Sequence, residues 1–109
     1  MIELKNNIVL GFAKDESYII AKSLIDARGY PYKPNKIKFV ATEKEFGSAL
    51  NDFEKNNSSI PIKKLEVVIN ALELLYYENG DFEALYDGVS KEDVKKLLDE
   101  LRNLFIQSN

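Results

Sequence analysis

Apolar residues recur at helical spacing along much of this chain, most densely between residues 65 and 86. In the first part of that stretch they follow the i, i+3, i+4, i+7 spacing of one helix face, at Leu65, Val68, Ile69, Leu72, Leu75 and Tyr76. Further apolar residues widen this face, so only a narrow stripe that includes Asn70 and Glu73 is expected to face water. Such a helix usually packs against several neighbours. We therefore predict that it is central and that Leu72 is fully buried.

The flanking residues predict where this helix begins and ends. Pro61 suits a first helical turn, because the N–H that it lacks would have no partner there. Asn79 and Gly80 both tolerate the left-handed conformation that ends helices. We therefore expect the helix over about 61–78.

Two further helices, one before the central helix and one after it, are predicted from their capping residues. Thr42 and Glu45 have the spacing of a capping box, which predicts a helix to about residue 55. Ser90 and Asp93 have the same spacing, with aspartate where glutamate is preferred. The helix that follows Ser90 carries an apolar stripe at Val94, Leu97, Leu98, Leu101, Leu104 and Phe105.

Two more helical segments are indicated. Asp15 is a fair N-cap and Gly29 a fair end for a helix over about 16–28. Its expected apolar face is formed by Tyr18, Ala21, Leu24 and Ile25, with Ile20 and Ala27 beside them. Asp81 and Gly88 frame a short helix in the acidic turn that follows the central helix.

Strands are indicated at two places. Residues 1–5 alternate in polarity, Asn6 and Asn7 can turn the chain, and the apolar run Ile8–Ala13 can return as a buried strand, so a hairpin is possible. Residues 37–41 also alternate, with Ile37, Phe39 and Ala41 on one face. If the two main strands are parallel, the helix at 16–28 is their right-handed crossover.

These elements predict a predominantly helical α+β fold. A small two- or three-stranded sheet is covered by helices in the order β-α-β-α-α-α, and the chain ends in a helical hairpin. An all-α bundle is the alternative, because both strands are short. The 109 residues are expected to form a single globular domain over 1–109.

Composition narrows the chemistry. The absence of Cys and His excludes thiolate zinc sites, cysteine nucleophiles, histidine bases and Ser-His-Asp triads. No glycine-rich phosphate-binding motif occurs, and no apolar run is long enough to span a membrane. We predict no catalytic, cofactor-binding or metal-binding residues, no membrane association and a cytoplasmic location.

The net charge of −3 conceals an asymmetry. Residues 1–64 carry 11 Lys and Arg against 8 Asp and Glu, whereas residues 65–109 carry 4 against 10. An acidic half disfavours nucleic acid, whose phosphates attract cations. It suits a basic protein partner.

The segment 73–88 combines this acidity with four of the 12 aromatic residues. Aromatic residues are enriched in interface hot spots, and neighbouring carboxylates would steer a cationic partner. Tyr77 is the aromatic residue least expected in the core, because Tyr76 already occupies the apolar face. The predicted partner-binding residues are Glu73, Tyr77, Glu78, Asp81, Phe82, Glu83, Tyr86 and Asp87.

The resulting hypothesis is a non-catalytic module that binds a basic protein, in the manner of an inhibitor, immunity protein or antitoxin that docks a cationic enzyme. The alternative is a self-associating structural or regulatory subunit, such as a homodimer. In it, the basic loop at residues 28–38 meets the acidic turn of another copy. A third reading is a carboxylate-dependent enzyme, with a divalent ion near Glu78, Asp81, Glu83 or Asp87.

Replacing Leu72 tests whether the central helix is buried. Leu72→Ala should lower the free energy of unfolding by about 2–5 kcal/mol, because it loses transfer energy and leaves a cavity that collapses incompletely. Chemical denaturation measures this cost. A cost near zero would mean that the helix lies on the surface.

Overall fold

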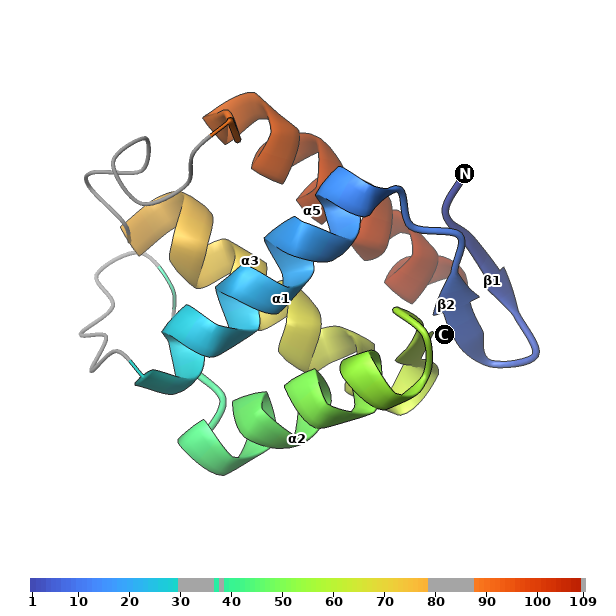
Figure 1. Ribbon diagram of the computed structural model, residues 1–109, viewed down its shortest axis with the longest axis horizontal. Helices are drawn as coiled ribbons and strands as arrows, with labels where there is room; N and C mark the ends of the chain where they lie inside the picture. The colour runs from blue at the N-terminus through green and yellow to red at the C-terminus, as the bar shows by residue number, and fades with distance from the viewer. Residues whose placement is uncertain (30–36, 38, 79–87, 109) are drawn as a thin grey trace.

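The protein is described by a computed structural model (Figure 1) that covers residues 1–29, 37, 39–78 and 88–108. Its helices and strands are β1 (Glu3–Lys5), β2 (Ile8–Leu10), α1 (Lys14–Gly29), α2 (Glu43–Lys55), β3 (Ile60–Pro61), α3 (Leu65–Glu78) and α5 (Lys91–Ser108). A short 3-10 turn at Ile62–Lys64 joins β3 to α3. The predicted class, a mostly helical α+β fold with a small sheet, is confirmed.

The possible N-terminal hairpin is present. β1 and β2 pair antiparallel, with Leu4 opposite Val9. Asn6 and Asn7 have φ angles of 53° and 63°. This conformation fits a tight turn whose twist matches that of the two strands, and asparagine tolerates it better than most residues. The local prediction was correct because the turn is encoded by the two residues that form it.

The strand predicted at 37–41 is absent from the described residues 37 and 39–41. The third strand is instead β3, which pairs antiparallel with β2 through Ile60 and Val9. The sheet order is β1-β2-β3 with both pairs antiparallel, so the parallel crossover through the first helix does not form. Pro61 ends this short strand and directly precedes the 3-10 turn, so the central helix begins at Leu65 and not at about 61 as predicted.

Asn70 explains why residues 39–41 stay outside the sheet. Its Nδ2 donates to the carbonyl oxygen of Phe39, and its Oδ1 accepts from the N–H of Ala41, each at 2.8 Å. The side-chain amide thus occupies the place that a neighbouring strand would take. The prediction that Asn70 faces water was wrong, because only 3% of the residue is exposed.

α3 is the centre of the fold, as predicted. It packs against α1, α2 and α5, and Figure 1 shows it behind α1. Leu65, Val68, Leu72 and Leu74 are each 0% exposed. α3 and α5 run antiparallel, since Tyr76 contacts Lys91 near the start of α5 while Glu73 pairs with Arg102 further along it. The short helix predicted between Asp81 and Gly88 lies outside the described residues.

The buried face of α1 differs from the predicted one. Ile19, Ile20, Ser23, Leu24 and Ala27 are buried, whereas Tyr18 and Ile25 are 42% and 40% exposed. Apolar residues surround this helix so evenly that spacing alone did not select the core face. Contacts with α2 and α3 selected it.

The helix caps predicted at Thr42 and Ser90 are present, whereas Asp15 is not an N-cap, because α1 begins at Lys14 and Asp15 lies in its first turn. The Glu45 N–H donates to Thr42 Oγ1, and the Thr42 N–H returns a bond to the Glu45 carboxylate. The backbone hydrogen bond from Thr42 lowers the pKa of Glu45. Ser90 and Asp93 exchange the equivalent two bonds at the start of α5, each at 3.1 Å. Aspartate therefore completes this cap although glutamate is the commoner residue.

Replacing Asn70 should release the 39–41 segment. Asn70→Ala is expected to lower the free energy of unfolding by about 1–3 kcal/mol, because it leaves buried backbone groups without partners. Asn103→Ala, at an exposed position of α5, should change it by less than about 0.5 kcal/mol. Amide hydrogen exchange at Ala41 should also accelerate in the Asn70 variant alone. Unchanged protection of Ala41 would contradict the proposed clamp.

Candidate functional site

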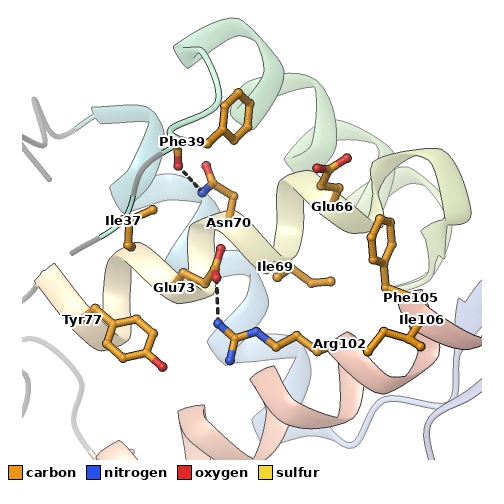
Figure 2. Close-up of a pocket in the computed structure, with 10 residues that line it drawn as sticks. All are labelled: Ile37, Phe39, Glu66, Ile69, Asn70, Glu73, Tyr77, Arg102, Phe105 and Ile106. Atoms are coloured by element: carbon orange, nitrogen blue, oxygen red, sulfur yellow. Dashed lines mark hydrogen bonds and ion pairs between the residues drawn. The ribbon is translucent and has the colours of Figure 1, made fainter. Parts of the chain in front are cut away.

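An open groove lies between α3, α5 and the residues Ile37 and Phe39, with a volume of about 630 Å³ (Figure 2). Its lining residues are Ile37, Phe39, Glu66, Ile69, Asn70, Glu73, Tyr77, Arg102, Phe105 and Ile106. The volume falls in the range of sites that hold a small ligand or a few side chains of a partner.

The floor of the groove is the polar stripe of α3. Glu66, Asn70, Glu73 and Tyr77 are spaced by three or four positions and therefore share one face of the helix. The rest of α3 is covered by apolar neighbours. The groove thus lies over the part of the central helix that is not closed by the core.

The rim of the groove is apolar and exposed. Phe39 is 58% exposed and Ile106 is 70% exposed, and both line the groove. Ile37 and Phe105 are half-buried beside them and pack against the core. Large apolar side chains grouped around a hollow are typical of binding surfaces, whereas isolated exposed ones need no explanation.

One ion pair spans the groove between α3 and α5. Arg102 Nη2 lies 2.7 Å from Glu73 Oε2, and Figure 2 shows the guanidinium reaching from α5 toward this carboxylate. Arg102 Nη1 also lies 3.8 Å from Asp99 Oδ1. Burial lowers the pKa of Arg102, but hydrogen bonds to Glu73 and Tyr77 outweigh it and the pKa is raised. Arg102 therefore remains charged throughout the physiological range.

Two further polar residues of the groove, Asn70 and Glu66, differ in whether they have hydrogen-bond partners. Asn70 uses both its oxygen and its nitrogen on residues 39–41. Glu66 is exposed and makes no hydrogen bond or ion pair with the described residues. Among the described residues the lining holds two carboxylates and one guanidinium, which leaves Glu66 as an acidic group without an opposite charge there.

Three of the predicted partner-binding residues lie in the described part of the chain. Glu73 and Tyr77 line the groove, and Glu78 is half-buried at the end of α3. Glu73 adds no uncompensated negative charge to this surface, because Arg102, from a distant part of the sequence, neutralises it. The other predicted residues lie outside the described residues: Asp81, Phe82, Glu83, Tyr86 and Asp87.

The sequence did not single out the apolar rim. Phe39 was assigned to a strand, and Phe105 was assigned to the core stripe of the last helix. Ile106 was the residue that could have indicated this rim, because it is apolar but lies beside the stripe of the last helix and not on it. Apart from Arg102 and Phe105, its neighbours in the groove come from segments more than 25 positions away, so spacing could not have joined them.

A second hollow, of about 400 Å³, lies at the start of α5 and is lined by Tyr76, Lys91, Glu92, Lys95, Lys96 and Asp99. Lys91 Nζ lies 4.9 Å from the centre of the Tyr76 ring. Lys95 pairs with Asp99 at 2.7 Å, and this hydrogen bond raises the pKa of Lys95. Two of its three cations thus already have partners, so the larger groove is the stronger candidate.

The part of the chain that the structure describes contains neither a metal-binding cluster nor a membrane-spanning helix. No group of three or more acidic, His or Cys side chains there could hold a metal ion. The carboxylates at 81, 83 and 87 lie outside the described residues, so the hypothesis that they bind a divalent ion stays a prediction. None of the described helices is both long and apolar enough to cross a membrane.

Comparison with known proteins does not assign the chain to a family. No family model matches the chain, and no curated protein or solved structure matches it significantly. Function is therefore argued from the groove itself.

The Glu73–Arg102 pair should contribute more to stability than a surface pair does. A double-mutant cycle with Glu73→Gln and Arg102→Met is expected to give a coupling energy of about 1 kcal/mol, because both side chains are partly shielded from water. The matched cycle with Lys95→Met and Asp99→Asn should give a smaller coupling energy, since that pair is more exposed and lies within one helix. Urea denaturation measures both. Equal coupling energies would mean that the groove pair is fully solvated.

Proposed function

We propose that this chain is a non-catalytic protein-binding module that docks a basic partner protein through the groove between α3 and α5. The observation that carries the proposal is the apolar rim of Phe39 and Ile106 beside the unneutralised carboxylate of Glu66. Exposed aromatic and aliphatic anchors supply most of the energy of protein interfaces, and acidic groups near them select a cationic partner.

The composition supports a binding role over catalysis. The chain has no His and no Cys, and the polar groups of the groove are largely bonded to one another. A general acid or base needs a group that is available to a substrate. Glu66 is available, but it is exposed to solvent and has no described partner that would hold it against a substrate.

Size and charge fit a stoichiometric inhibitor of a cationic enzyme, as an antitoxin or immunity protein is. The chain has a mass of 12.5 kDa and a net charge of −3. A cytoplasmic location is part of the proposal, and it agrees with the absence of Cys, which is expected of a protein that needs no disulfides.

Self-association is a second candidate, favoured by one observation. Tyr18 and Ile25 are seven positions apart on α1, so they share an exposed face of that helix. Lys22 lies between them on the same face. This apolar and cationic face has the character that the groove would accept from a second copy.

Site-specific crosslinking tests the proposed function. A photoreactive residue at Ile106, introduced in the host cell, is expected to capture a discrete protein whose sequence is basic. The same residue at Ile25, which is exposed on α1, is the matched control and should capture it weakly or not at all. Glu66→Lys in the Ile106 variant should reduce the yield, because it repels a cationic partner.

Mass spectrometry of the adducts decides between the readings. Capture of a basic protein at Ile106 and loss of the adduct with Glu66→Lys support the proposal. Equal capture of that protein at Ile25 would place the interface elsewhere. Adducts formed only between copies of this chain would favour self-association.

A further inference from the structure

We infer that the groove accepts a peptide segment in which bulky apolar side chains flank a lysine or arginine, the apolar side chains contacting Phe39 at one end of the groove and Ile106 at the other and the cation facing Glu66 between them. This inference rests on the proposed function and names the chemistry of the partner. It is drawn from how the groove distributes apolar surface and hydrogen-bonding capacity.

The apolar part of the occupant is required by the rim. Phe39 and Ile106 expose more than half of their surface, and the half-buried Ile37 and Phe105 continue that surface into the groove. Burying apolar area is favourable by about 25 cal/mol per Å². Leucine or phenylalanine side chains of a partner peptide would cover the two ends of this rim, whereas a small polar ligand would leave them in water.

The cationic part is required by the balance of charges. Glu73 and Arg102 neutralise each other at 2.7 Å, and the described lining then retains only Glu66 as an acid without an opposite charge. Asn70 offers little to a ligand, because its oxygen and nitrogen already bond to residues 39–41. A cation next to the apolar anchor would meet an acceptor at Glu66.

An anionic occupant fits less well. Arg102 is the cation of the lining, and it is engaged by Glu73 and lies 3.8 Å from Asp99. A carboxylate or phosphate would have to displace these bonds and would also lie near Glu66. Fatty acids, phospholipid headgroups and acidic peptides are therefore disfavoured.

Three synthetic peptides separate the two requirements. A labelled amphipathic peptide of leucine and lysine carries both features, its leucine–glutamate counterpart reverses the charge, and its serine–lysine counterpart removes the apolar anchor. Fluorescence anisotropy at an ionic strength of about 0.15 M, where nonspecific attraction is screened, measures their binding to the full chain. Only the leucine–lysine peptide is expected to bind tightly, and its contacts should appear in NMR spectra at Ile69, Glu73 and Ile106.

Variants of the chain locate the binding. Glu66→Lys should weaken binding of the leucine–lysine peptide by about three- to tenfold, mainly by slowing association. Phe39→Ser should weaken it by at least about tenfold, mainly by speeding dissociation. Ile25→Ser removes an exposed apolar residue from α1 and should change the affinity by less than about twofold. Circular dichroism confirms that each variant is folded.

Several outcomes would overturn the inference. It fails if the leucine–glutamate peptide binds as well as the leucine–lysine peptide, or if binding is insensitive to Glu66→Lys and Phe39→Ser. It also fails if sedimentation shows that the chain alone forms dimers that these two changes abolish, because the occupant is then a second copy.

These failures are distinguishable from failure of the proposed function. If a partner protein crosslinks at Ile106 but its affinity is unaffected by the charge at position 66, the function stands and the inferred recognition is wrong. If no protein crosslinks at Ile106, the binding function itself is wrong at this surface.

Discussion

The structure depends on one constraint, which is that α3 must be covered on nearly every side. Most of its residues are apolar, and a helix of this kind is stable only when other elements remove it from water. α1, α2 and α5 provide that cover, and the short strands close the remaining end. The polar stripe of Glu66, Asn70, Glu73 and Tyr77 cannot be covered in the same way, because an apolar neighbour would leave its hydrogen bonds unmade.

That stripe instead attaches the walls of the groove through polar bonds. Asn70 fixes the backbone of residues 39–41, which places Phe39 at the rim. Glu73 fixes Arg102, which orients the last turns of α5 and with them Ile106. The interactions that complete the fold are therefore the same ones that shape the candidate binding surface. Of the charged positions on the stripe, Glu66 is left without a described partner, and it is also the group on which the proposed recognition depends.

The arrangement is the reason why we propose binding and not chemistry. Catalysis requires polar groups that are held in place but still available to a substrate, whereas here Asn70, Glu73 and Arg102 are occupied in holding the fold. What remains available is apolar area and one exposed carboxylate. These features provide an anchor and a charge preference, which suit the recognition of another protein. The acidic and aromatic residues at 81–87 lie outside the described part of the chain and remain a prediction for the same surface.

The sequence by itself determined the features that arise from neighbouring residues. The Asn6–Asn7 turn, the caps at Thr42 and Ser90 and the burial of Leu72 follow from bonds or apolar spacing within a few positions, so pattern was sufficient. Only the tertiary structure decided the third strand, the buried face of α1, the burial of Asn70 and the pairing of Glu73 with Arg102. Each of these depends on segments far apart in the chain, and for each the local pattern allowed more than one solution. The groove belongs to this second group, because its walls meet only after α3 has been enclosed.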